Sequence, residues 1–351
     1  MYTQTSTTLL DSAGIAAAIS AADFSRFSAT VVGYGFVGQQ YVKALLALGV
    51  QRIRVCTRSA ERVAPLRGDP DIELLTGGFE EMTAVSTPGE LVIIGTPTAR
   101  LVEAVHKLCD LGFRHLLIEK PVALNADGIE RLTEDLNRRG VEAAVAYNRV
   151  AYPAYHEIQA RVAREGGVTS CTYTFTEMIK PNWQELFPPE ELARWGIANS
   201  LHVMSMVHSL IGLPREYHAH HVRNGRIAWH PTGDVFVGAG TSERGIPFSY
   251  HADWGSTGRW SIELHTRASS YLLRPLEEVR RRTAPLAEWE KLPLEVFAPD
   301  VKPGFAEEVA AMLHPTLRAH IPLFSLSRAA ALTRFGEQVF GYDQAPNQNN
   351  G

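Results

Sequence analysis

Two short motifs carry residues whose types and spacing suit redox chemistry with a nucleotide cofactor. The first, Gly33-x-Gly35-x-x-Gly38, follows the apolar run 29–32. Glycines at this spacing permit a tight turn, let the backbone approach a pyrophosphate and let the next helix pack closely. The second, Glu119-Lys120-Pro121, ends the apolar run 115–118. A partly desolvated lysine near a positive nicotinamide would have its ammonium disfavoured, so it could accept or donate a proton.

The end of the next apolar run indicates which nicotinamide cofactor to expect. An NAD enzyme usually has Asp or Glu there, bound to the ribose 2′-hydroxyl. This chain has Thr57, nineteen residues after Gly38, followed by Arg58 and Ser59. These side chains can donate to a 2′-phosphate, the acid that would repel it is absent, and Arg62 offers a second cation. We therefore predict NADP(H) as the cofactor.

These motifs need a scaffold of alternating strands and helices, which the pattern from residue 29 to 150 predicts. Helical stretches, several closed by glycine, separate short apolar runs, which indicates a parallel, doubly wound sheet, the Rossmann fold. Ligands of such sheets bind beyond the carboxyl ends of the strands. We expect further cofactor contacts from that edge, at Phe36, Val37, Thr96, Pro97, Glu119 and Lys120. The expected strands are 30–32, 52–56, 72–75, 91–94, 116–119 and 143–147.

After residue 150 the pattern changes to many short strands. They predict an α+β domain with a large, mainly antiparallel open sheet, interrupted by a helix at 198–211. Asn224-Gly225 predicts a hairpin between 216–222 and 227–229. The other expected strands are 168–176, 234–238, 247–253, 260–266 and 271–273. The predicted organisation is an N-terminal arm at 1–28, a Rossmann domain at 29–150, a substrate-binding and oligomerisation domain at 151–343, and a disordered tail at 344–351. We expect the last helix, 304–313, to pack back near the first domain.

The order of motifs resembles the glucose–fructose oxidoreductase and inositol dehydrogenase family (Gfo/Idh/MocA). Its members share the glycine turn, a segment like Gly95-Thr96-Pro97-Thr98, the Glu119-Lys120-Pro121 motif and a segment like Tyr147-Asn148-Arg149, and the resemblance spans roughly residues 30 to 340. It implies a Rossmann domain joined to an open antiparallel sheet, and oxidation or reduction of a sugar or cyclitol carbon. It also implies that Lys120 is catalytic and that the bond before Pro121 is cis, which X-Pro bonds tolerate.

The helix at 198–211 holds the second group that the resemblance implies. His202 matches the family histidine, but Ala198 and Ser205 stand where the family has two Asp residues. His202 can orient a substrate hydroxyl or relay its proton, and the alternative is a core histidine bonded to backbone. Asn199 lies on the same helix face and could anchor a hydroxyl. Either Lys120 and His202 suffice for catalysis without the two acids, or the substrate or the reaction differs from the family's sugar oxidation.

Three further residues are candidates for substrate binding. Asn148 and Arg149 lie in the family's substrate segment, and Arg149 could grip a phosphate or carboxylate or form a structural ion pair. Trp183 lies in a Pro-bounded loop that is a candidate cleft wall, although core or subunit packing is an alternative. The cluster 217–221 places His218 and His220 on one strand face and His221 on the other, so we predict no metal site.

Composition limits the partners. The chain has 351 residues, formal net charge −4 and no basic surplus, which argues against nucleic acid or an anionic membrane. Its three cysteines show neither the spacing of a metal site nor a disulfide framework. No apolar run reaches the length of a membrane span, and the N-terminus lacks a signal-peptide pattern. We therefore predict a cytoplasmic protein. An open sheet needs a cover, which predicts a homodimer or homotetramer.

Together these features predict an NADP(H)-dependent oxidoreductase. Its small-molecule substrate would be a secondary alcohol or ketone of a sugar, sugar phosphate, nucleotide sugar or cyclitol, with Lys120 as acid/base and His202 as its helper. Two alternatives stay open: an imine or enamine reductase using the same cleft, and a non-catalytic NADP-sensing protein, which the missing Asp pair motivates.

Overall fold

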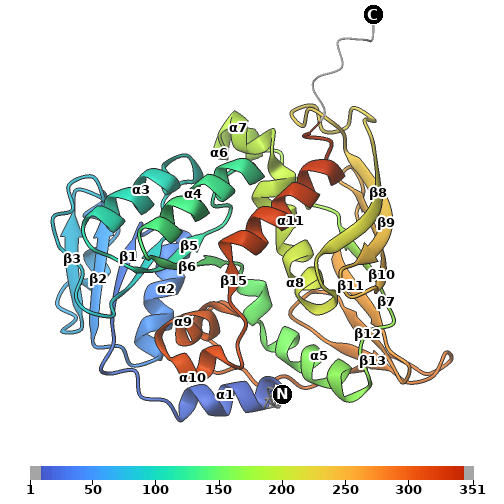
Figure 1. Ribbon diagram of the computed structural model, residues 1–351, viewed down its shortest axis with the longest axis horizontal. Coiled ribbons are helices and arrows are strands. Elements are labelled where there is room, and N and C mark those ends of the chain that lie inside the picture. Colours follow the sequence, from blue (N-terminus) through green and yellow to red (C-terminus); the bar gives the residue numbers. More distant parts are fainter. Residues whose placement is uncertain (1–8, 344–351) are drawn as a thin grey trace, which may run out of the picture. The chain divides into compact units, whose positions relative to one another are not determined.

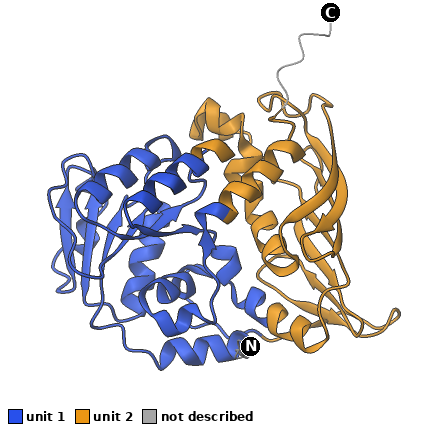
Figure 2. Cartoon of the chain, in the orientation of Figure 1, with its two compact units in different colours: residues 1–123, 129–157, 294–327 blue, residues 124–128, 158–293, 328–351 orange. Residues whose placement is uncertain are grey.

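A computed structural model describes residues 9–343, which form two compact units (Figure 2). The first holds residues up to 123, 129–157 and 294–327, and the second holds 124–128, 158–293 and the chain from 328 onward. Residues 294–327, which include the predicted last helix at 304–313, belong to the unit of the first sheet. The predicted tail at 344–351 and the first eight residues of the predicted arm lie outside the described residues.

The first unit is built on a seven-stranded sheet in the order β15-β6-β5-β4-β1-β2-β3. All neighbours are parallel except β15, which runs antiparallel to β6. The strands are β1 (Ser28–Val32), β2 (Arg52–Thr57), β3 (Ile72–Thr76), β4 (Leu91–Ile94), β5 (His115–Glu119), β6 (Glu142–Ala146) and β15 (Phe324–Ser325). Strand β4 is buried along its whole length, as expected of a parallel strand covered on both faces.

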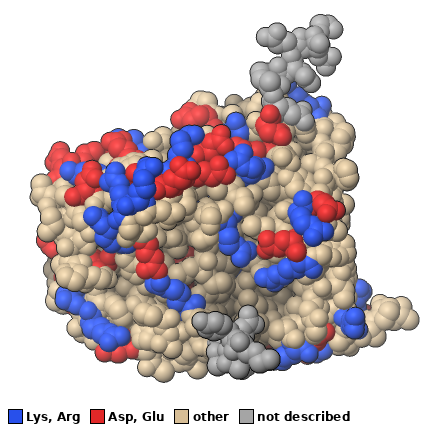
Figure 3. All heavy atoms as spheres, in the orientation of Figure 1, with Lys and Arg blue, Asp and Glu red and all other residues tan. Residues whose placement is uncertain are grey.

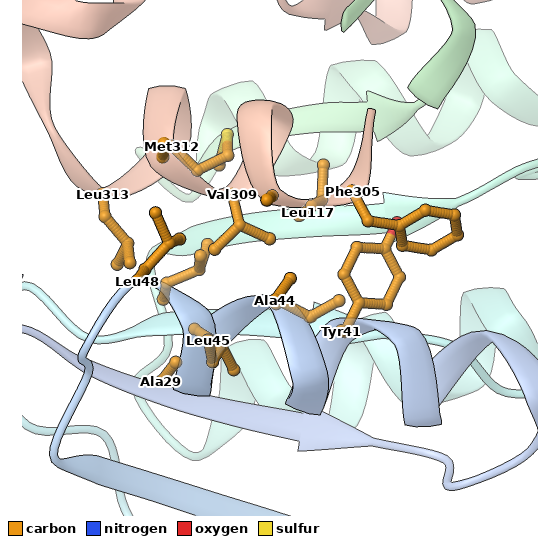
Figure 4. Packing of buried hydrophobic residues seen from close by; sticks show 14 of the residues in the cluster. Ala29, Tyr41, Ala44, Leu45, Leu48, Leu117, Phe305, Val309, Met312 and Leu313 are labelled. Atoms are coloured by element: carbon orange, nitrogen blue, oxygen red, sulfur yellow. The ribbon is translucent and has the colours of Figure 1, made fainter. Parts of the chain in front are cut away.

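Helices cover both faces of this sheet (Figure 1). On one side lie α3 (Thr98–Asp110) and α4 (Ala126–Arg138), and on the other α2 (Phe36–Ala47) and α9 (Phe305–Leu313). Figure 4 shows Leu45 of α2, Val309 of α9 and Leu117 of β5 in one buried cluster, which explains why the late segment belongs to this unit. The unit also contains α1 (Ser12–Ser20), η1 (Ala64–Leu66), η2 (Asn148–Ala151) and α10 (Pro315–Arg318), while α5 (Pro153–Arg164) begins in it.

The outer surface over α3 and α4 carries charges of both signs (Figure 3). Arg139 of the loop after α4 pairs with Asp110 at 2.8 Å and with Asp135 at 2.8 Å. Mixed charge of this kind is typical of a solvated helix face and provides no basic patch there. No helix among the described residues is both long and apolar enough to cross a membrane.

The second unit is built on an eight-stranded sheet in the order β14-β13-β12-β11-β7-β10-β9-β8. Only the β7–β10 pair is parallel. The strands are β7 (Ser170–Phe175), β8 (Pro214–Val222), β9 (Val235–Ser242), β10 (Pro247–Asp253), β11 (Trp260–His265), β12 (Ser270–Leu273), β13 (Arg280–Arg282) and β14 (Glu290–Lys291). The helices are α6 (Trp183–Leu186), α7 (Pro189–Leu192), the π-turn η3 (Gly196–Ser200), α8 (Leu201–Ile211) and α11 (Leu326–Val339), which starts at the end of the first unit. The predicted fold class, a Rossmann domain plus a mainly antiparallel sheet, is confirmed.

The predicted hairpin at Asn224-Gly225 is wrong. Strand β8 pairs with β9, and residues 227–229 form no strand. The connection is a longer loop closed by Asp234, whose carboxylate accepts hydrogen bonds from the backbone N–H of Asn224 at 2.8 Å and of Arg226 at 2.9 Å. A side chain ten residues away thus satisfies the turn that a two-residue hairpin would have closed through strand pairing.

The exposed face of the second sheet is polar at its centre. Along β10 the exposed positions include Ser249 and His251, and the neighbouring strands present Thr172 and Glu263. Ser249 donates a hydrogen bond to Thr172 at 3.1 Å. The premise that an open sheet here exposes an apolar patch is therefore not supported, and assembly as a homodimer or homotetramer stays a prediction that rests on the family resemblance.

Burial of His208 in α8 makes stability depend on pH. Burial lowers its pKa from 6.5 to about 4, and its Nδ1 lies 3.0 Å from the Gly212 carbonyl oxygen. Because the folded pKa is the lower one, the unfolded state binds more protons as pH falls from 6.5 to 4, and folding loses stability in that window. At about 1.36 kcal/mol per pH unit the loss is at most about 3 kcal/mol.

We expect His208→Asn, which keeps a donor for Gly212, to flatten the fall in the free energy of unfolding between pH 6.5 and 4. Denaturant titrations at a series of pH values measure this, with the exposed His251→Asn as the matched control. Parallel pH profiles for wild type and His208→Asn would contradict the assignment.

Candidate active site

A pocket of about 550 Å³ opens at the carboxyl ends of β1, β2 and β4 in the first unit. Its position is that expected for a ligand of a doubly wound sheet. Most of the predicted cofactor residues, from the glycine turn, the end of β2 and Thr96-Pro97, lie in its wall, whereas Gly38, Glu119 and Lys120 do not line it. The lining is formed by 32–37, 56–59, Arg62, 78–80, 95–97 and Arg100.

Two glycines of the turn have no room for a side chain, and the third borders open space. Gly33 has φ +95°, and a Cβ on it would lie 2.5 Å from the Gly95 carbonyl oxygen. A Cβ on Gly38 would lie 1.9 Å from the Gly33 carbonyl oxygen, so only glycine lets α2 approach β1. At Gly35 nothing lies within 4 Å of that position. Gly35 also caps α2 without a side-chain hydrogen bond, which leaves the N-terminal amides of the helix for an anion.

The pocket lining includes Thr96, whose side chain is a buried polar group. The Thr96 hydroxyl is buried and, among residues 9–343, has no hydrogen-bond partner. Phe36 is 65% exposed at the mouth, an unusual exposure for an aromatic ring that lines a pocket. The open space at Gly35 and the buried hydroxyl of Thr96 fit a bound dinucleotide.

The end of β2 forms the opposite wall. Thr57 is buried, and its hydroxyl accepts a hydrogen bond from the Ser59 backbone N–H at 3.2 Å. The Ser59 hydroxyl accepts one from the Arg62 N–H at 3.4 Å. Arg58 is exposed and lines the pocket. The structure thus brings these four predicted residues to one wall.

Sequence analysis missed a carboxylate in the same wall. Glu80 lines the pocket and pairs with Arg100 at 3.0 Å. A Cβ placed on Gly78 would lie 2.6 Å from Glu80 Oε2 and 2.7 Å from Arg58 Cγ, so the two side chains border the same glycine. Glu80 comes from the loop after β3, and no local motif could indicate it.

The end of β5 carries Glu119 and Lys120. The peptide bond between Lys120 and Pro121 is cis, as predicted. Glu119 Oε2 accepts a hydrogen bond from the Lys120 backbone N–H at 3.1 Å, and its Cγ lies 3.9 Å from the Cβ position of Gly95 in the pocket wall. Burial raises the pKa of Glu119, while the charges of Lys120 and Arg149 oppose the rise. Lys120 is half-buried.

Asn148 and Arg149 are engaged with their own unit. The Asn148 amide is buried and donates to the Pro303 carbonyl at 3.1 Å, and Arg149 Nη1 donates to Asn148 Oδ1 at 3.2 Å. Asn148 therefore links η2 to the loop before α9. Arg149 also lies over the Tyr152 ring at 5.7 Å.

In the second unit, Asn199 lies in η3 and His202 in α8. His202 is 8% exposed, and its ring centre is 6.1 Å from that of Trp260. Asn199 Nδ2 donates to Glu177 Oε2 at 2.7 Å, and the Ser200 hydroxyl donates to Glu177 Oε1 at 2.6 Å. Glu177 is buried and follows β7. Sequence analysis missed this carboxylate, which lies beside the helix that lacks the family's two acids.

Trp183 packs within its own loop. Its ring centre lies 4.4 Å from that of Trp195 and 6.1 Å from that of Phe187. This cluster anchors α6 and leaves Trp183 half-buried.

Solved structures with low sequence identity share this fold. UDP-N-acetylglucosamine 3-dehydrogenase from Acidithiobacillus ferrooxidans is 17% identical with a TM-score of 0.67, and the alignment covers 90% of this chain and 96% of that one. A putative myo-inositol dehydrogenase from Sinorhizobium meliloti is 18% identical with a TM-score of 0.68, covering 91% and 99%. A super-repressor mutant of Gal80p from Saccharomyces cerevisiae is 14% identical with a TM-score of 0.69, covering 90% and 95%.

Sequence comparison points to the Rossmann domain. A curated relative, glutamyl-tRNA reductase 1 from Pyrobaculum calidifontis, is 28% identical over 180 residues, and the match spans 48% of this chain but only 42% of that protein. Residues 27–147 match the model of the Gfo/Idh/MocA oxidoreductase family, described as an NAD-binding Rossmann fold. Residues 27–147 therefore match the Rossmann domain of this oxidoreductase family, and the solved structures share the fold over most of the chain.

Proposed function

We propose that this protein is an NADP(H)-dependent oxidoreductase that transfers hydride to or from a secondary alcohol or ketone carbon of a carbohydrate-like substrate. The observation that carries the proposal is the pocket at the carboxyl ends of β1, β2 and β4, together with the end of the neighbouring strand β5, where Lys120 follows Glu119. Lys120 is not among the residues that line this pocket, and its place beside the nicotinamide is part of the proposal, because coupled proton and hydride transfer requires a titratable group there.

In the oxidation direction, Lys120 Nζ takes the proton of the substrate hydroxyl while hydride leaves the same carbon. The oxidised nicotinamide supplies the hydride acceptor when bound. In reduction, the protonated Lys120 returns the proton to the carbonyl oxygen. Glu119 lies next to this lysine and favours its charged form, which prepares it to donate.

Two residues of η3 and α8 are the proposed substrate-orienting groups. His202 would orient a substrate hydroxyl, and Asn199 would anchor another. Glu177 holds the Asn199 amide at 2.7 Å and so fixes which atom of that amide is presented. This carboxylate would replace the missing helix acids as the charged group of the segment.

Glu177→Gln is expected to lower kcat/KM by about tenfold to a hundredfold, because charge-assisted hydrogen bonds are worth about 1.5–3 kcal/mol. Cofactor affinity should not change. Steady-state kinetics measure the effect, with the exposed Glu185→Gln of the same unit as the control. A kcat/KM equal to wild type would remove Glu177 from the proposed site.

The solved structures of this fold support the proposed substrate class. Their names refer to a nucleotide sugar, a cyclitol and, in a complex with NADH and L-sorbose, levoglucosan. We therefore propose a screen of sugars, sugar phosphates, nucleotide sugars and cyclitols with NADP+, followed by the absorbance of the reduced nicotinamide. Turnover of at least one of these classes is the expected result.

A non-catalytic NADP sensor is the second candidate. The absence of the two family acids at Ala198 and Ser205 favours it, and the fold is shared with a super-repressor mutant of Gal80p. Tight NADP(H) binding without turnover in the whole screen would favour this second function.

A further inference from the structure

A buried hydroxyl connects two carboxyl groups behind the proposed catalytic lysine. Tyr41 of α2 places its hydroxyl oxygen 2.9 Å from Glu119 Oε1 and 2.8 Å from Glu308 Oε1 of α9. All three side chains belong to the first unit, and Tyr41 and Glu308 are almost fully buried. Figure 4 shows Tyr41 beside Phe305, where its ring packs at 4.7 Å.

Counting protons shows that these groups cannot all be in their ordinary states at neutral pH. A tyrosine hydroxyl has one proton and so can donate to only one carboxylate. Two ionised carboxylates on one hydroxyl would leave one short oxygen–oxygen contact without a proton, between two buried like charges. The geometry is satisfied when one carboxyl is protonated and donates to the Tyr41 oxygen, while Tyr41 donates to the other.

The surroundings identify Glu308 as the protonated member. The charged side chains that act on it are Glu119 and Glu307, both acidic, and burial raises its pKa well above the usual range. Burial raises the pKa of Glu119 as well, but the positive charges of Lys120 and Arg149 and the Lys120 N–H beside it oppose the rise and favour its ionised form. Among the described residues, no such positive neighbour acts on Glu308. Tyr147 also faces Glu119, and burial with that negative charge keeps its phenol neutral by raising its pKa.

We propose that Glu308 and Tyr41 form a positioning pair in which both groups stay protonated, so that the negative charge of the three groups lies on Glu119, next to Lys120. Glu308 donates to Tyr41, and Tyr41 donates to Glu119. The pair thereby fixes the Glu119 carboxylate and sets the proton affinity of Lys120. The inference rests on the proposed function only in giving Lys120 its acid/base role.

The proton on Glu308 is tested without a substrate. Infrared spectra at pH 8.5 should show the C=O stretch of a protonated carboxylic acid in the wild type, and Glu308→Gln should remove it. Glu307 is the nearest confounding group, because burial raises its pKa to about 7, but it is mostly ionised at pH 8.5 and Glu307→Gln should leave the band in place. A wild-type spectrum without the band would overturn the proposal even if the variants did not fold.

The coupling to Lys120 is tested by the pH dependence of its acylation, followed by mass spectrometry of the labelled peptide. Glu308→Gln keeps a neutral donor to Tyr41, so its labelling midpoint should equal that of the wild type. Glu119→Gln removes the negative neighbour and should lower the midpoint by about one pH unit or more. Tyr41→Phe, which keeps the ring packing, should lower it in the same direction.

Two results would overturn the coupling. One is a Glu308→Gln variant that shifts the Lys120 midpoint as far as Glu119→Gln does. The other is a Glu119→Gln variant whose midpoint equals that of the wild type. Neither readout requires turnover. A protein with the carboxylic-acid band and the expected shifts of the Lys120 midpoint but no dehydrogenase activity would contradict the proposed function and support this inference.

Discussion

Replacing Lys120 with methionine is expected to lower turnover by about 10²–10⁴, the usual contribution of a positioned acid/base. Methionine keeps the unbranched chain of the half-buried side chain but cannot accept or donate the proton. The fold should be retained, and NADP(H) affinity should change little, because in the proposed site the glycine turn and the N-terminus of α2 would bind the pyrophosphate.

The measurement is kcat on the best substrate of the screen, with cofactor titration of the same sample. Lys43→Met, an exposed lysine of α2, is the matched control and should behave as wild type. His202→Ala should have a smaller effect if the histidine only orients the substrate, and a comparable one if both residues form one relay, because such pairs are not additive. Near-wild-type turnover of Lys120→Met would contradict the acid/base assignment.

The sequence predicted the first sheet well because its strands are short apolar runs. Strand β4 is buried on both faces, and its pattern shows this without any knowledge of its neighbours. The predictions were weaker where tertiary contacts decide. The loop at 223–234 depends on the Asp234 carboxylate, and the short strands β13 and β14 have too few residues to show a period.

In the candidate site, too, residues in local motifs could be predicted and residues brought in by tertiary contacts could not. The glycine turn, Thr57 and Lys120 stand in local motifs, so their positions could be deduced from spacing. Glu80 and Glu177 come from loops whose local sequence carries no recognisable signal, and each is brought to its place by pairing of distant strands. Nothing in the sequence connects Tyr41 with a glutamate 267 residues later, because that contact exists only once α9 packs on α2.

The second large effect concerns the choice of cofactor. We expect wild type to bind NADP(H) more tightly than NAD(H), because Thr57 stands where NAD enzymes have an acid and Arg58 and Ser59 line the same wall. Arg58→Ala should lower NADP(H) affinity by about tenfold to a hundredfold, the loss of about 1.5–3 kcal/mol from a charge-assisted phosphate contact. NAD(H), which lacks the 2′-phosphate, should lose much less.

Glu80 makes this a sharp test, because it is the carboxylate that would oppose a phosphate or bind a ribose hydroxyl. The ion pair between Glu80 and Arg100 at 3.0 Å compensates the charge of Glu80, so we expect Glu80→Gln to change the preference for NADP(H) over NAD(H) little. Arg67 is an exposed arginine outside the pocket lining, and Arg67→Ala is the control that should leave both affinities unchanged. Fluorescence titrations of wild type and each variant with NADPH and NADH measure the affinities for both cofactors. If wild type binds NADH more tightly and Glu80→Gln abolishes that preference, then Glu80 rather than Thr57 and Arg58 selects the cofactor, and the pocket is an NAD site.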